Sequence, residues 1–221
     1  MAYTTWGSSC SKKRKRSISE ENCNHNTTIN NTPANIKHTE TNNTETIFRI
    51  NNHLYFYDSV SKKNNLRFTI LLRDIDNEQQ IKLQHNQIEL PTIHIHINSG
   101  GGSLLDGFSM ASAVINCKSH TISYVEGIVA SAASLPLVVS NERKIQQYCY
   151  VLIHQLSSSS WGTYENFKDE KNNLDNFMNQ LSSLYLKYTK VPDKKLKNIL
   201  KHDLYWDANT CLKYKIVDSI C

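Results

Sequence analysis

The strongest constraint on the fold lies near the middle of the chain, where a short apolar strand runs into three consecutive glycines. The strand consists of alternating isoleucines and histidines: Ile93, His94, Ile95, His96 and Ile97. The isoleucines therefore share one face of the strand and the histidines the other. Gly100, Gly101 and Gly102 follow, and a backbone without Cβ atoms can approach a ligand closely and expose its N–H groups. This segment predicts a buried strand that ends either in a flexible strand-to-helix turn or in a turn that binds an oxyanion. A phosphate site is less favoured, because neither the GxGxxG spacing nor a GKS/GKT ending is present.

Strand and helix patterns alternate along most of residues 47–221. Strand patterns occur near Leu54 and Phe56 and in residues 91–98, 120–127 and 144–154. Apolar residues at helical or mixed spacing occur in residues 64–78, 104–117, 128–140 and 164–188. Alternation of this kind predicts an α/β fold with a mostly parallel sheet. The last of these segments, Tyr164 to Tyr188, predicts a long amphipathic helix.

Residues 1–46 differ in composition from the rest of the chain. Between residues 22 and 46, 15 of 25 positions are Asn or Thr, with no apolar periodicity. Such a segment cannot bury enough apolar surface to offset its ordering entropy, so we predict a disordered tail before a domain at residues 47–221. The tail holds the basic cluster Lys12–Arg16, typical of a nuclear-import or nucleic-acid-contact segment or of a solvated run, and we favour the solvated run.

Charge and hydropathy exclude several classes of protein. The formal net charge is a modest +5, so extensive nucleic-acid binding is not expected outside Lys12–Arg16. No run of about 18 apolar residues predicts a membrane helix, and the N-terminus lacks the apolar region of a secretory signal. We therefore expect a cytoplasmic location, with nuclear entry through Lys12–Arg16 as the alternative. Six cysteines without a CxxC pair are expected to be reduced thiols, and no cofactor is indicated.

Three polar residues stand out because of their positions between predicted elements. Ser131 lies among small residues between a predicted strand and a helix, where the helix N-terminal field and free N–H groups favour a nucleophile. His154 follows an apolar strand, and Asp203 lies between bulky apolar residues. Taken singly, each has an ordinary structural explanation, such as close helix packing for Ser131. Ser134 is a rival nucleophile, although a helical step would turn it away from His154 if Ser131 faces that residue.

The histidines at positions 94 and 96 need a separate interpretation. Two histidines at i and i+2 on one strand face can bind zinc or copper. No acidic residue or cysteine has an obvious spacing for completing such a site. We favour two polar positions on the second face of the sheet, with no metal bound.

Taken together, four ordered motifs resemble those of the Clp protease proteolytic subunit family, ClpP, and specifically its shorter phage-like and virus-like relatives. The matching segments are Ile97–Gly102, Gly127–Ser134, Ile153–Gln155 and His202–Asp218. The resemblance implies a ClpP/crotonase-type βαβ spiral core with a long handle helix at Tyr164–Tyr188. Two departures are the replacement of the family's proline by Gly100 and of its Met-Gly pair by Ala132 and Ala133.

The resemblance also implies an ATP-dependent-type serine endopeptidase acting on unfolded proteins or short peptides. In that interpretation Ser131 is the nucleophile, His154 the general base and Asp203 the residue that orients His154. The backbone N–H groups of Gly102 and Ala132 would form the oxyanion hole. A ring-type homo-oligomer is implied, while an AAA+ unfoldase partner stays open. Two alternatives are a catalytically degenerate ClpP-like scaffold subunit and a crotonase-type thioester enzyme.

Overall fold

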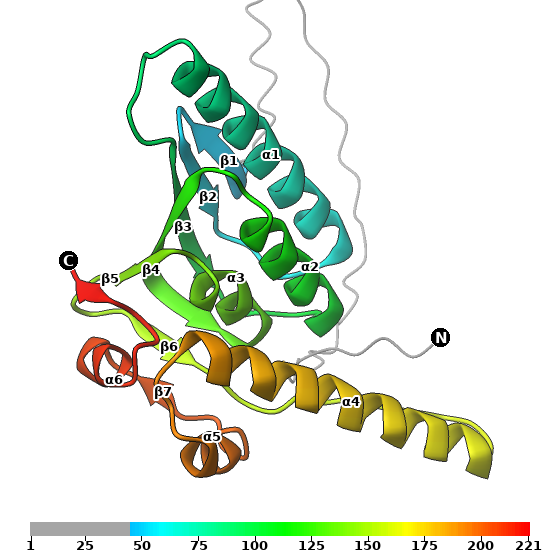
Figure 1. Cartoon of the computed structure of the whole chain (residues 1–221). Coiled ribbons are helices and arrows are strands. Elements are labelled where there is room, and N and C mark those ends of the chain that lie inside the picture. Colours follow the sequence, from blue (N-terminus) through cyan, green and yellow to red (C-terminus); the bar gives the residue numbers. More distant parts are fainter. Residues whose placement is uncertain (1–44) are drawn as a thin grey trace, which may run out of the picture. The chain divides into compact units, whose positions relative to one another are not determined.

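The computed structural model (Figure 1) describes residues 45–221. The predicted disorder of the N-terminal tail and the cluster Lys12–Arg16 lie outside these residues, apart from positions 45 and 46. The first strand of the described chain begins at Ile47. Among the described residues, no helix has the length and apolar content needed to cross a membrane.

Strands and helices alternate through the described chain, which confirms the predicted α/β class. The strands are β1 (Ile47–Ile50), β2 (His53–Phe56), β3 (Thr92–Ser99), β4 (His120–Ala130), β5 (Glu142–Ile145), β6 (Tyr150–Leu152), β7 (Tyr205–Trp206) and β8 (Ser219–Ile220). The helices are α1 (Lys62–Gln84), α2 (Leu104–Ile115), the 3-10 helix η1 (Ser131–Ala133), α3 (Ser134–Val138), α4 (Tyr164–Tyr188), α5 (Asp193–Ile199) and α6 (Ala208–Lys213).

The strands form one sheet, with the order β1-β2-β3-β4-β5-β8. β1 and β2 form an antiparallel hairpin, while β2, β3, β4 and β5 run parallel. β4 changes partner along its length, because Ile122–Val125 pair with β5 and Ile128–Ala130 pair with β6. β6 also pairs with β7, in the antiparallel sense. The end of β4 therefore lies beside the end of β6, which places two predicted site residues near each other.

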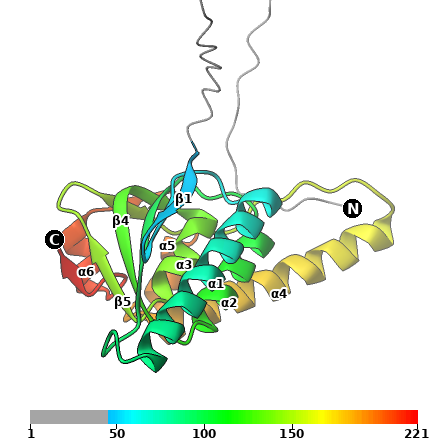
Figure 2. The same cartoon turned by 90° about the horizontal axis from the view of Figure 1, so that it is seen from above.

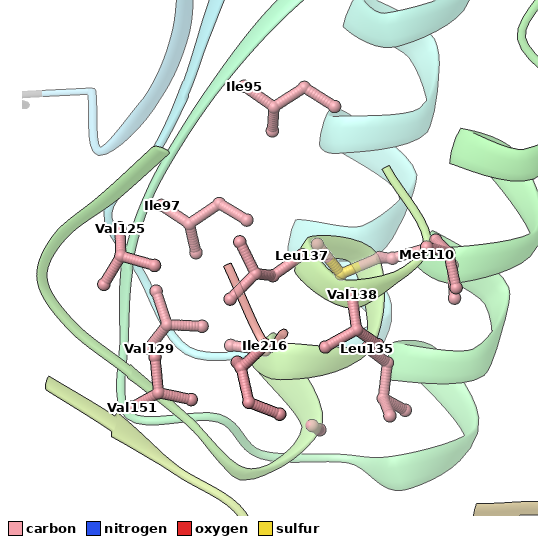
Figure 3. Close-up of a cluster of buried hydrophobic side chains, with 14 of the residues drawn as sticks. Ile95, Ile97, Met110, Val125, Val129, Leu135, Leu137, Val138, Val151 and Ile216 are labelled. Carbon is pink, nitrogen blue, oxygen red and sulfur yellow. The ribbon is translucent and has the colours of Figure 1, made fainter. Parts of the chain in front are cut away.

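The core lies between the sheet and the helices α1, α2 and α3, which occupy one face of the sheet in both views (Figures 1 and 2). The isoleucines of β3 are at most 1% exposed, as the alternating pattern predicts. Figure 3 shows Ile95, Ile97, Val125 and Val129 of the sheet facing Leu137 of α3. Full burial of one such side chain stabilises the fold by about 1.5–3 kcal/mol.

Helix α2 begins directly after the glycine turn. Ser103 is its N-cap, and its hydroxyl accepts a hydrogen bond from the Asp106 N–H at 3.4 Å. Gly107 lets this helix approach η1 closely, because a Cβ there would lie 2.8 Å from the carbonyl oxygen of Ala132. The glycine turn and the Ser131 segment are consequently packed together through α2.

The predicted helix at residues 128–140 begins later than expected. Ile128, Val129 and Ala130 are the last residues of β4, and helical structure begins at Ser131. The reason is tertiary: these three residues form a ladder with Tyr150–Leu152, which outweighs their local helical spacing.

Helix α4 spans the predicted residues, Tyr164 to Tyr188. Thr163 and Asn166 form a capping box at its start. In both views its N-terminal half extends beyond the other described elements of the domain (Figures 1 and 2).

Candidate functional site

Ser131 lies at the sharp turn between β4 and η1. Its φ angle is +62°, in the left-handed region that non-glycine residues rarely adopt. Such a conformation costs about 1–3 kcal/mol and persists only where the surrounding structure holds it. The residue is 2% exposed. Residues with strained backbone angles cluster at functional sites, so the φ angle of Ser131 indicates a functional residue independently of the sequence motif.

His154 reaches Ser131 because β6 runs parallel to the end of β4. Ala130 is paired with Leu152, so the residues that follow each strand leave the sheet side by side. The Nε2 atom of His154 lies 3.1 Å from the Oγ atom of Ser131, within hydrogen-bond distance. The imidazole side chain is 15% exposed.

Asp203 reaches His154 through a second strand pairing. In the antiparallel ladder of β6 and β7, Leu152 is paired with Tyr205. Continuing this register by two residues places His154 opposite Asp203. The Nδ1 atom of His154 is hydrogen-bonded to Oδ1 of Asp203. The structure therefore brings the three predicted residues into one chain of hydrogen bonds, with Asp203 at the solvent end and 76% exposed.

The glycine turn lies directly against Ser131. A Cβ on Gly101 would be 2.5 Å from the Cβ of Ser131, so only glycine allows this approach. The φ angle of Gly101 is +89° and that of Gly102 is +151°. A Cβ on Gly102 would lie 2.2 Å from the carbonyl oxygen of Val60. Both positions thus require glycine, whereas Gly100 has no atom within 4 Å of a Cβ position.

Two backbone N–H groups near Ser131 are oriented by their neighbours. Val60 donates its N–H to the Gly101 carbonyl, and Ser103 donates to the Val60 carbonyl, each at 2.8 Å. In such a parallel bridge the N–H of the middle residue, Gly102, points away from Val60 and therefore toward the β4 side. Ala132 is the second residue of η1, where helical N–H groups have no carbonyl partner within the helix.

Ser134, the rival nucleophile, faces the protein interior. Its Oγ atom donates a hydrogen bond to the carbonyl oxygen of Ser131 at 2.5 Å. The same Oγ lies 2.5 Å from the hydroxyl oxygen of Tyr185 on α4. The predicted turn away from His154 is therefore present. The partnership with Tyr185 had no sequence signal, because 51 positions separate the two residues.

An apolar cavity of about 360 Å³ is lined by Ile128, Tyr150 and Tyr205. Ile128 of β4 is paired with Tyr150 of β6, so these two side chains lie side by side on one face of the sheet.

The histidines of β3 belong to a different cluster on the second face of the sheet. The Nδ1 atom of His94 lies 3.0 Å from the Tyr124 hydroxyl, and Nδ1 of His96 lies 2.8 Å from a Glu126 oxygen. Within residues 45–221, no three His, Cys, Asp or Glu side chains are grouped so as to hold a metal ion.

Comparison with known proteins adds independent information. The family model described as Clp protease matches residues 49–221. The chain is 25% identical over 162 residues to the ATP-dependent Clp protease proteolytic subunit of Oltmannsiellopsis viridis, covering 70% of this chain and 83% of that protein. It is 26% identical over 164 residues to proteolytic subunit 2 of Treponema denticola, covering 71% and 82%. A third match, to the Chlamydomonas reinhardtii subunit, is 27% identical over 134 residues and spans only 26% of that longer protein.

Proposed function

Because this chain belongs to the Clp protease family of ClpP-like serine peptidases, we propose that it is an active serine endopeptidase with Ser131, His154 and Asp203 as its catalytic residues. The observation that carries the proposal is the continuous hydrogen-bond chain from Ser131 Oγ through the His154 imidazole to the Asp203 carboxylate. A serine hydroxyl is a weak nucleophile until a base removes its proton, and this arrangement places a base at 3.1 Å.

The reaction follows from the positions of the atoms. Asp203 accepts the Nδ1–H of His154, which leaves Nε2 unprotonated and able to take the proton of Ser131. The Oγ–carbon bond to the substrate carbonyl then forms, and the peptide C–N bond breaks as His154 returns the proton to the leaving amine. Water, activated by the same imidazole, hydrolyses the acyl-enzyme and restores Ser131.

The tetrahedral intermediate carries a negative oxygen that needs fixed donors. We assign this role to the backbone N–H groups of Gly102 and Ala132. Each such donor is worth about 3 kcal/mol of barrier in related chemistry. Support for the assignment comes from the Val60 bridge, which orients Gly102, and from the position of Ala132 in the first turn of η1.

We further propose that the enzyme works as a homo-oligomer on unfolded polypeptides or short peptides. The relatives are named as subunits of ATP-dependent proteases, which supports assembly and cooperation with an ATP-driven unfoldase. The apolar cavity lined by Ile128, Tyr150 and Tyr205 can take an apolar side chain of the substrate, and such side chains become accessible when a protein unfolds.

The two other candidate functions use the same fold without the full set of residues. A thioester enzyme of the crotonase type needs the glycine turn and helix N-terminus to hold an enolate oxygen, and has no need of a bonded serine, histidine and aspartate together. A degenerate scaffold needs none of the three. The intact hydrogen-bond chain therefore favours the peptidase.

Labelling with a fluorophosphonate tests the proposal. The full-length chain is treated with the probe, the modified residue is mapped by mass spectrometry, and hydrolysis of a panel of fluorogenic peptides is measured in parallel. We expect stoichiometric labelling at Ser131 with peptide hydrolysis, and loss of both in Ser131→Ala. Labelling elsewhere, or hydrolysis that survives Ser131→Ala, would refute the assignment. Thioester hydrolysis without labelling would favour the crotonase alternative.

A further inference from the structure

A buried hydrogen-bond relay joins α4 to the backbone of the proposed nucleophile. The Ser134 hydroxyl donates to the Ser131 carbonyl at 2.5 Å and lies 2.5 Å from the Tyr185 hydroxyl. A serine has one hydroxyl proton, so Tyr185 must donate to Ser134. Ser131 is 2% exposed, and Ser134 and Tyr185 are fully buried. Burial raises the pKa of Tyr185 well above its usual range, which keeps it a donor.

The accepting carbonyl belongs to the peptide unit that also carries the Ala132 N–H. A trans peptide is planar, and its C=O and N–H point in opposite directions. A contact that holds the Ser131 carbonyl toward the interior therefore also holds the Ala132 N–H in the opposite direction, away from the interior. The left-handed φ of Ser131 makes this important, because a strained peptide unit can relax unless it is held.

The donor end of the relay is itself anchored. Arg143 donates from Nη1 to the carbonyl of Tyr188 at 2.6 Å and to that of Val138 at 3.2 Å. Its other guanidinium nitrogens donate to the carboxylate of Asp218 at 2.9 Å. The C-terminal ends of α3 and α4 are thus tied to one guanidinium, which fixes the separation between Ser134 and Tyr185.

We propose that Ser134 and Tyr185 are positioning residues that hold the Ser131–Ala132 peptide unit so that the Ala132 N–H faces the oxyanion of the transition state. The inference rests on the proposed peptidase function and deepens it. It assigns a catalytic consequence to a residue of α4 that lies outside the hydrogen-bond chain of Ser131, His154 and Asp203. If the Ala132 N–H is misaligned with the tetrahedral oxyanion, the enzyme stabilises the transition state less, while its affinity for the substrate stays the same.

Tyr185→Phe and Ser134→Ala test the relay, with Ser140→Ala as the matched control. Ser140 is a buried serine whose hydroxyl donates to the Pro136 carbonyl at 3.0 Å and pairs with Ser123 at 2.6 Å. Ser140→Ala likewise removes a buried serine hydroxyl and its two hydrogen bonds, but at a position that is not bonded to Ser131. For each variant we would measure kcat and KM on a fluorogenic peptide, the affinity for a peptide boronate that forms a tetrahedral adduct, and the thermal unfolding midpoint.

We expect Tyr185→Phe and Ser134→Ala to lower kcat by at least about tenfold with KM within about twofold of the wild type. Boronate affinity should fall in proportion to kcat/KM, because the adduct uses the same donor. Ser140→Ala should lower the unfolding midpoint by a similar amount while keeping kcat.

Three results would overturn the inference. The first is an unchanged kcat in Tyr185→Phe, the variant that preserves the buried ring and is the milder of the two for folding. The second is an equal loss of kcat in Ser140→Ala, which would show that the loss in Tyr185→Phe and Ser134→Ala comes from reduced stability of the fold. The third is a wild-type chain that neither hydrolyses peptides nor reacts with a fluorophosphonate, which would also refute the proposed function. The first two leave the proposed function intact, so the failures are distinguishable.

Discussion

The imidazole of His154 and the carboxylate of Asp203 are hydrogen-bonded across the ends of β6 and β7, and the Asp203 side chain remains 76% exposed to solvent. Water and salt screen a charge at such a site, so its electrostatic effect on the imidazole is small. Its geometric effect is larger, because accepting the Nδ1–H fixes both the tautomer and the ring direction. We therefore expect Asp203 to act mainly by orienting His154.

The first prediction concerns the three residues as a unit. Ser131→Ala and His154→Ala should each lower peptide turnover by more than about 1,000-fold, and the double variant should be hardly worse than either, because residues that act together are non-additive. Asp203→Asn should be milder but still severe, since the amide keeps a hydrogen bond but favours the wrong tautomer of the His154 imidazole. Steady-state rates with a fluorogenic peptide measure all four. Additive losses in the double variant, or full activity of Asp203→Asn, would contradict the prediction that the three residues act together.

The second prediction uses the neighbouring glycines of the turn. Alanine at position 101 would place a Cβ 2.5 Å from the Cβ of Ser131 and 2.6 Å from the Ala130 carbonyl oxygen, at a backbone φ of +89°. The turn must shift, and a displacement of about 1 Å at a reacting group costs about 100-fold in rate. Gly100→Ala is the control, with no atom within 4 Å of its Cβ. Equal activity of the two variants would show that the turn does not set the position of Ser131.

The sequence predicted those parts of the site that local patterns encode. The alternation of isoleucine and histidine predicted β3 and its buried isoleucines, and the run of three glycines predicted the turn. The helical spacing of apolar residues predicted the bounds of α4. Asp203 is different, because its contact with His154 joins residues 49 positions apart through the pairing of β6 with β7. Its role came from the family resemblance alone. No local pattern encodes such a pairing, nor the left-handed backbone of Ser131.

The second face of the sheet carries stacked rings with close hydrogen bonds. His53 and His94 stack with centroids 4.3 Å apart, and His96 stacks on Tyr124 at 4.7 Å. The groups that set the charge environment come from β2, β3 and β5. Burial lowers the pKa of His94 to about 4. Electrostatic interactions with His53, His96 and Lys144 lower this pKa further, and that with Glu142 opposes the shift.

The third prediction follows from the direction of that shift. An unfolded histidine titrates near about 6.5, so between about pH 6.5 and 4 the unfolded chain binds a proton that folded His94 does not. The free energy of unfolding should therefore fall as pH decreases through this window, by about 1 kcal/mol between pH 7 and pH 5 after solvent screening. Urea unfolding at both pH values measures it.

The control for this pH effect is an exposed histidine. His94→Gln keeps a hydrogen-bonding group near Tyr124 without the titration, and should flatten the dependence between pH 7 and pH 5. His202→Gln removes a histidine at an exposed position and should leave the dependence unchanged. A flattening caused by His202→Gln alone would contradict the assignment to the β3 cluster.

The apolar stripe of α4 divides into two parts with different environments. Leu181 and Tyr185, in the C-terminal half, are fully buried within their own chain. Periodicity identifies a face of a helix and not what covers that face. The N-terminal half is the uncovered part, where Tyr164 is 72% exposed and Phe167 47% exposed.

The last prediction concerns assembly through that N-terminal half. Phe167 belongs to the N-terminal half of α4, the half that extends beyond the other described elements (Figure 2), and it remains 47% exposed. Exposed aromatic side chains of this kind mark protein interfaces. Phe167→Asp should therefore produce smaller species in sedimentation velocity, with peptide turnover reduced in proportion to the loss of assembly. Ile70→Asp is the control, because Ile70 is 46% exposed on α1 and should change neither measurement. A Phe167→Asp chain with unchanged sedimentation would place the interface elsewhere, and a fully active monomer would show that the hydrogen-bond chain of Ser131, His154 and Asp203 needs no neighbouring subunit.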